Sequence, residues 1–161
     1  MITLNTFDRS PRLAELKVSY KRQRARNPKP PGVPPVITSA RTAEEYLRSV
    51  WNRDTLELVE DFFVVCLNTA HEPLGWVRVS SGGFDSTSVD PRLIFGVALQ
   101  VASAAILIAH NHPSGDLSPS AQDKAVTQRL KEAGQLLRIP VLDHIILSKE
   151  AAFSFADHGL L

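Results

Sequence analysis

The sequence has only one cysteine, Cys66, among its 161 residues. A single cysteine cannot form an internal disulfide, and it cannot supply the several thiolates that are typical of structural zinc sites. The sequence also lacks a run of about 20 apolar residues, which a membrane-spanning helix requires, and shows no secretory signal pattern. These absences predict a cytoplasmic protein without membrane contact, in which Cys66 is a small buried apolar residue.

An excess of charge of either sign is absent as well. The chain has 18 Lys and Arg against 17 Asp and Glu, so its formal net charge is +1. This balance gives no overall electrostatic preference for nucleic acid or for a membrane surface. The 43% hydrophobic and 22% charged composition is ordinary for one globular domain.

Residues 1–40 differ in composition from the rest of the chain. They contain a basic arm, followed by prolines at positions 28, 30, 31, 34 and 35, and the cations of the arm are Lys21, Arg22, Arg24, Arg26 and Lys29. Proline-rich chain favours an extended linker. We therefore predict an N-terminal extension over residues 1–40 and one folded domain over residues 41–161. The arm either contacts DNA phosphates or is solvated, and its lack of aromatic residues to stack on bases favours the solvated state.

Apolar periodicity and helix-start signals alternate along the folded part. Thr42 and Glu45 form a possible capping box, and Asp90-Pro91 and Ser118-Pro119 each resemble an N-cap followed by a proline in the first helical position. The predicted helices are 42–51, 92–102 and 119–134, and the predicted strands are 62–67, 76–79, 104–109 and 139–147. This alternation indicates an α/β fold, a mixed sheet with flanking helices.

A cluster of metal-ligand types follows the apolar strand 104–109. His110 and His112 are two residues apart at the strand end, so both side chains leave the same face. Ser120 and Asp123 are three apart in the following helix and share a face. Two imidazoles and one carboxylate, with a fourth position left to water, form a catalytic zinc site. The alternative is a His-x-His surface turn beside an ordinary helix-start acid, and the Ser-x-x-Asp continuation favours the metal site.

The spacing His-x-His, seven residues, Ser, two residues, Asp matches the signature of the JAMM (JAB/MPN-type) zinc metallopeptidases. The segment from His110 to Ser120, with Val89-Asp-Pro-Arg92 before it and Leu142-Asp-His-Ile-Ile146 after it, resembles the JAMM domain of the bacterial RadC family over residues 40–161. The resemblance implies the cytidine-deaminase-like JAB/MPN fold. It also implies that His110, His112 and Asp123 hold Zn²⁺ and that Ser120 stabilises an oxyanion. His144, in the last of these motifs, is more typical of a packed or hydrogen-bonded residue than of a ligand.

The general base is expected upstream, at Glu60. Strand parity places Glu60 on the face of Phe62, where desolvation raises a carboxyl pKa. RadC-like sequences have Glu-x-Phe at the start of this strand, and Glu60-Asp61-Phe62 fits that pattern. An exposed glutamate at a strand entrance is the alternative, and Glu57 and Asp61 are the other candidates for the base.

Together with the resemblance, these residues predict a zinc metallopeptidase or isopeptidase-like hydrolase, in which Glu60 activates a zinc-bound water against an amide of a peptide or protein. The alternative is a RadC-like DNA-associated repair module that binds DNA through the basic arm without peptidase activity. A zinc deaminase is excluded, because the chain has neither the Glu one residue beyond a ligand His nor the Pro-Cys-x-x-Cys pair. The literal tripeptide His-Asn-His does not indicate a nuclease, because the nuclease motif of that name uses separated residues.

The two possible roles of the basic arm predict different salt dependence. We expect weak duplex binding that is equal for the full chain and for a chain beginning at Ser39, measured by fluorescence anisotropy at two salt concentrations. If all five cations neutralise phosphates, the log–log slope would instead approach about −4 to −5, from roughly −0.9 per phosphate. Tight binding that disappears with the arm would favour the DNA-associated module.

Overall fold

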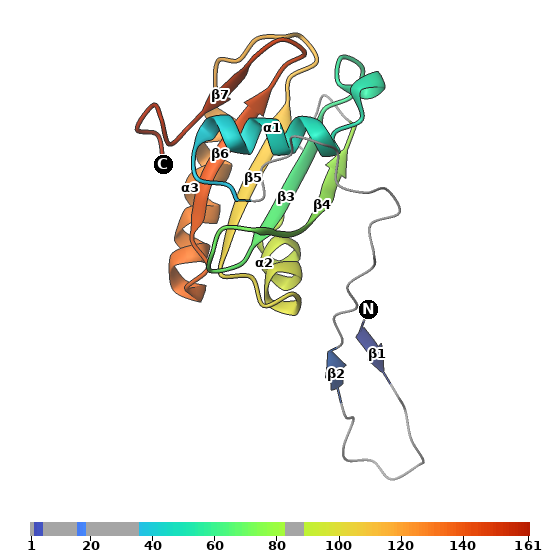
Figure 1. Ribbon diagram of the computed structural model, residues 1–161, viewed down its shortest axis with the longest axis vertical. Coiled ribbons are helices and arrows are strands. Elements are labelled where there is room, and N and C mark those ends of the chain that lie inside the picture. The colour runs from blue at the N-terminus through green and yellow to red at the C-terminus, as the bar shows by residue number, and fades with distance from the viewer. Residues whose placement is uncertain (1, 5–15, 19–35, 83–88) are drawn as a thin grey trace.

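The computed structural model describes residues 2–4, 16–18, 36–82 and 89–161 (Figure 1). The predicted basic arm, residues 21–29, lies outside the described residues. Near the N-terminus two short strands, β1 (Ile2–Leu4) and β2 (Leu16–Val18), pair in antiparallel fashion. The folded domain follows from residue 36.

The domain contains a five-stranded sheet in the order β4-β3-β5-β6-β7. Its strands are β3 (Asp61–Leu67), β4 (Pro73–Ser81), β5 (Ala105–Asn111), β6 (Val141–Leu147) and β7 (Ala152–Ser154). β5 and β6 are parallel, and the other neighbouring pairs are antiparallel. The predicted α/β class with a mixed sheet is confirmed.

Helices cover both faces of this sheet (Figure 1). α1 (Ala40–Val50) lies on one face, and α2 (Pro91–Gln100) and α3 (Ala121–Leu137) lie on the other. Side chains along β3 alternate between the two cores: Phe63 and Val65 pack with Leu47 of α1, whereas Val64 and Cys66 belong to the core of α2 and α3. Cys66 is buried, as its apolar surroundings in the sequence predicted.

The starts of two helices differ from the sequence prediction. Ser39, not Thr42, is the N-cap of α1, because its hydroxyl accepts from the Thr42 amide while the Thr42 hydroxyl accepts from the Ser39 amide. Ser120, not Ser118, caps α3 through the same reciprocal exchange with Asp123. In both cases the cap has a polar partner three residues later, which satisfies two amides that a helix end otherwise leaves unpaired. The predicted Asp90 cap of α2 is confirmed.

The sheet brings three chain segments to one edge of the domain. β3 and β5 run antiparallel with Phe62 opposite His110, so the beginning of β3 lies beside the end of β5. The chain then passes from β5 to the N-terminus of α3.

Within the described ranges, no helix combines the length and the apolar character needed to cross a bilayer.

Candidate metal centre

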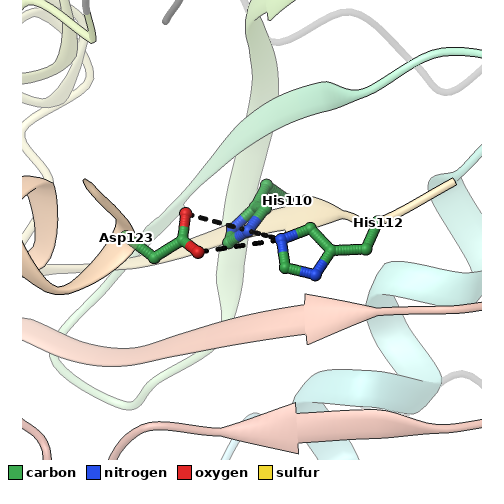
Figure 2. A group of neighbouring side chains, drawn as sticks. All are labelled: His110, His112 and Asp123. Atoms are coloured by element: carbon green, nitrogen blue, oxygen red, sulfur yellow. Dashed lines mark hydrogen bonds and ion pairs between the residues drawn. The ribbon is translucent and has the colours of Figure 1, made fainter. Parts of the chain in front are cut away.

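Three side chains of metal-ligating type converge where β5 ends and α3 begins (Figure 2). His110 lies in β5, His112 follows the strand, and Asp123 is in the first turn of α3. The two Nε2 atoms are 2.9 Å apart. Asp123 Oδ1 lies 3.2 Å from His110 Nε2, and Asp123 Oδ2 lies 3.7 Å from His112 Nε2. One potential ligand atom from each residue lies within 4.8 Å of the others, so the group could hold one metal ion.

The surroundings favour neutral imidazole for His110 and an ionised carboxylate for Asp123. Burial lowers the pKa of His110 to about 4. Burial alone would raise the pKa of the Asp123 carboxyl, but the neighbouring imidazoles of His112 and His110 and the hydrogen bonds from Ser120 outweigh it and lower that pKa. The nearby Asp123 carboxylate raises the pKa of His112, so a proton competes with a metal ion there.

A buried chain of hydrogen bonds fixes the tautomer of His110. The Thr127 hydroxyl donates to the backbone carbonyl of Asp123 at 2.6 Å and lies 2.6 Å from His144 Nδ1. Because that hydroxyl proton is used, His144 Nδ1 must be the donor to it, which leaves His144 Nε2 as an acceptor. His110 Nδ1, at 2.8 Å from His144 Nε2, is therefore protonated. The lone pair of neutral His110 is consequently on Nε2, the atom that faces His112 and Asp123.

His112 is oriented in the same way by a backbone group. Its Nδ1 lies 2.5 Å from the carbonyl oxygen of Asp116, which can only accept a hydrogen bond. Nδ1 is therefore protonated, and neutral His112 also has its lone pair on Nε2. Two lone pairs 2.9 Å apart and a neighbouring carboxylate repel one another unless a proton or a cation lies among them. This set of nitrogen and oxygen donors fits a divalent transition metal.

Ser120 contacts the third candidate ligand directly. Its hydroxyl donates to Asp123 Oδ2 at 2.6 Å and accepts from the Asp123 amide at 3.0 Å, and the Ser120 amide donates to Oδ2 at 2.8 Å. Ser120 therefore holds the Asp123 carboxylate in place. The predicted role at an oxyanion remains a prediction, and it requires the hydroxyl proton to turn away from Asp123.

Glu60 lies in a cleft beside this group. The cleft has a volume of about 590 Å³, and its lining includes Glu60, His112, Leu58, Pro113 and Gly82. Partial burial raises the pKa of Glu60, while the charge of His112 acts to lower it and that of Asp123 to raise it. Glu60 is thus close enough to the candidate ligands to interact with them electrostatically, although its side chain is more exposed than strand parity suggested.

The other two acidic candidates make contacts of their own. Glu57 also lines the cleft, and its carboxylate forms an exposed ion pair with Lys149, with an O–N distance of 2.8 Å. Asp61 is buried, and its Oδ1 lies 3.6 Å from a guanidinium nitrogen of Arg78 on β4. Neither contact is with a candidate ligand. The assignment of the base to Glu60 remains a prediction.

The sequence prediction did not assign Thr127 to the site and gave His144 no specific partner. His144 is packed and hydrogen-bonded, as expected for that strand position. Its contact with His110 depends on the pairing of β5 with β6, because the two histidines are 34 residues apart in the chain. The available signal was a polar Asp-His pair inside an otherwise apolar strand, which identifies a buried polar group but not its partner.

Comparison with known proteins agrees with this geometry. The family model described as RadC-like JAB domain matches residues 37–160. The chain belongs to this family. The resemblance seen in the metal-ligand motif is thereby confirmed for almost the whole folded domain.

Several relatives are about 40% identical to this RadC-like JAB chain over the part that aligns with it. A UPF0758 protein of Rubrobacter xylanophilus is 40% identical over 150 residues, which cover 92% of this chain and 62% of the relative. The UPF0758 protein YfjY of Escherichia coli is 44% identical over 102 residues, 63% of this chain and 64% of the relative. A UPF0758 protein of Flavobacterium johnsoniae is 39% identical over 101 residues, 63% of this chain and 44% of the relative. The chain thus spans about half to two thirds of the length of these relatives.

The tautomer argument predicts the effect of removing His144. We expect His144→Phe to keep the fold but to weaken Zn²⁺ binding by about 10–100-fold, because His110 Nδ1 loses its acceptor and Nε2 is no longer reserved for the metal. Competition with a chromophoric chelator measures the affinity. His158→Phe is the control, because His158 is exposed and stacks on Phe153. Equal affinities for His144→Phe and the unaltered protein would contradict this role.

Proposed function

We propose that this chain is a zinc-dependent hydrolase that cleaves an amide bond of a peptide or protein. The observation that carries the proposal is the convergence of two imidazole lone pairs and a carboxylate on one point. Membership of the RadC-like JAB family supports the same assignment. The chain covers only part of the length of these relatives, so similarity to them does not by itself assign an activity.

Zinc fits this group better than the other common biological metals. Magnesium and calcium prefer sets of oxygen ligands, whereas two imidazoles and one carboxylate form a catalytic zinc set with a position left for water. When bound, zinc supplies Lewis acidity, which brings the pKa of a water molecule near neutrality and polarises a carbonyl oxygen. His110, His112 and Asp123 are the residues that would hold it.

Glu60 is the residue proposed to move the proton. Partial burial raises the pKa of its carboxyl, so it is a stronger base than a fully solvated glutamate. Its carboxylate would accept a proton from the attacking water and would then donate that proton to the nitrogen of the leaving amine. Glu60 and His112 line the same cleft, which supports their assignment as base and ligand.

Ser120 and the cleft wall have supporting roles in this proposal. Ser120 is an exposed residue at the start of α3, and its hydroxyl, turned away from Asp123, would hydrogen-bond the oxygen that becomes negatively charged as the amide carbon turns tetrahedral. Leu58 and Pro113 give the cleft an apolar part, and the Leu58 side chain is 75% exposed. Such a wall suits an apolar side chain next to the amide.

Metal content provides the first test. Protein purified without chelators should contain about one zinc per chain, and His112→Ala should lose it while circular dichroism and cooperative unfolding are retained. We expect the fold to survive because His112 contributes to the site and not to either apolar core. Elemental analysis that finds no metal in the unaltered protein would reject a zinc enzyme.

The second test separates the base from the metal. Glu60→Gln should keep zinc and lose hydrolysis by at least about 10²-fold, because the amide has the shape of the carboxylate but cannot accept the proton. Cleavage of an unbiased peptide library, followed by mass spectrometry, measures the activity. Glu132→Gln, on the exposed side of α3, is the matched control. Activity that persists in Glu60→Gln and disappears in Glu57→Gln would assign the base to Glu57.

A further inference from the structure

The middle residue of the His-Asn-His sequence has no place in the ligand set, yet it is completely buried. Asn111 is the last residue of β5, with a relative exposure of 0%. A buried side-chain amide costs free energy unless its donors and acceptor are paired. All three hydrogen bonds of the Asn111 side chain go to one segment, residues 56–61, which also contains Glu60.

These hydrogen bonds allow only one orientation of the amide. Asn111 Oδ1 accepts from the Asp61 amide at 2.8 Å, and Nδ2 donates to the carbonyls of Leu56 at 2.7 Å and Val59 at 2.8 Å. A backbone amide can only donate and a carbonyl can only accept, so the side chain needs one acceptor and two donors. Asparagine provides both, whereas an aspartate would set a second oxygen against the two carbonyls.

The segment that is hydrogen-bonded to Asn111 has little regular structure of its own. Residues 56–60 connect a short 3₁₀ turn, Arg53–Thr55, to β3, and the amides of Leu58 and Val59 both donate to the carbonyl of Thr55. Glu60 is tied on its other side, where its carbonyl accepts from the amide of Gly82. Without Asn111, the position of the segment relative to β5 would depend on far fewer contacts.

We propose that Asn111 is a positioning residue, which fixes the segment bearing Glu60 against the strand that bears the candidate ligands His110 and His112. The inference rests on the proposed function, because Asn111 would set the distance between the proposed base, Glu60, and the metal ion. Adjacent residues of a strand face opposite ways, so the end of β5 would hold the metal on one side and the base segment on the other. A displacement of about 1 Å in such a group typically costs about 10²-fold in rate.

Asn111→Asp tests the clamp, because it keeps the side-chain volume and one acceptor but removes both donors. Hydrogen exchange should become at least about 10-fold faster at the Leu58 and Val59 amides, since loss of local structure exposes them more often. Zinc content should stay near one per chain. With the best-cleaved library peptide as probe, kcat should fall by about 10²-fold with KM within roughly threefold, because binding surfaces remain and only the base is misplaced.

Ser103→Ala is the matched control. Its buried hydroxyl also ties β3 to β5, through Leu67 and the carbonyl of Ala105, but at the opposite end of the two strands from the metal centre. It should lower the unfolding temperature without changing exchange at Leu58 and Val59 or the zinc content. If Asn111→Asp fails to fold, Asn111→Ala, which introduces no buried charge, is measured in its place.

The outcomes separate this inference from the proposed function. Exchange at Leu58 and Val59 no faster than in Ser103→Ala, an unchanged kcat, or loss of zinc in the Asn111 variant would each overturn the positioning role. An unaltered protein that binds no zinc and cleaves no library peptide would instead reject the proposed function. In that case the exchange measurement still decides whether Asn111 holds residues 56–61.

Discussion

The two buried polar side chains at the end of β5 each need hydrogen-bond partners, and this requirement organises the site. His110 and Asn111 are consecutive and almost fully buried, with exposures of 1% and 0%. An unpaired buried donor or acceptor costs about 1–3 kcal/mol, so each additional polar side chain has to arrive with its partner. His144, Thr127 and residues 56–61 are the partners. Their positions follow from the pairing of β5 with its two neighbours, β3 and β6.

Because successive side chains of a strand point to opposite faces, the end of β5 contacts two different parts of the site. His110 lies on the side of α3 and directs Nε2 toward Asp123, whereas the next residue, Asn111, bonds to the segment before β3. The apolar cores on the two faces hold the strand rigidly, because Leu107 and Ala109 pack on the α1 side while Ile106 and Ile108 pack on the other. Packing on both faces therefore fixes the backbone from which His110 and Asn111 project.

Local patterns in the sequence predicted much of this arrangement. The α/β class and the convergence of His110, His112 and Asp123 could be predicted because each depends on spacing within a strand or within one helical turn. The cap of α3 was misplaced by two residues, since Ser118-Pro119 and Ser120 both satisfy the simple rule and only the exchange with Asp123 distinguishes them. The partners of His110 and Asn111 could not be predicted, because they depend on strand register across separations of 34 and about 50 residues.

The hydrogen-bonded series from Asp123 through Thr127 and His144 to His110 also constrains how the sequence can diverge. Thr127 and His144 each have one donor and one acceptor committed to their neighbours, and solvent does not reach either residue to replace a lost partner. A change at one position therefore leaves a polar atom of the neighbouring residue without a hydrogen-bond partner. Positions 127 and 144 should therefore covary among related sequences although they lie on different elements of the fold, because a tolerated pair must still provide an acceptor for His110 Nδ1.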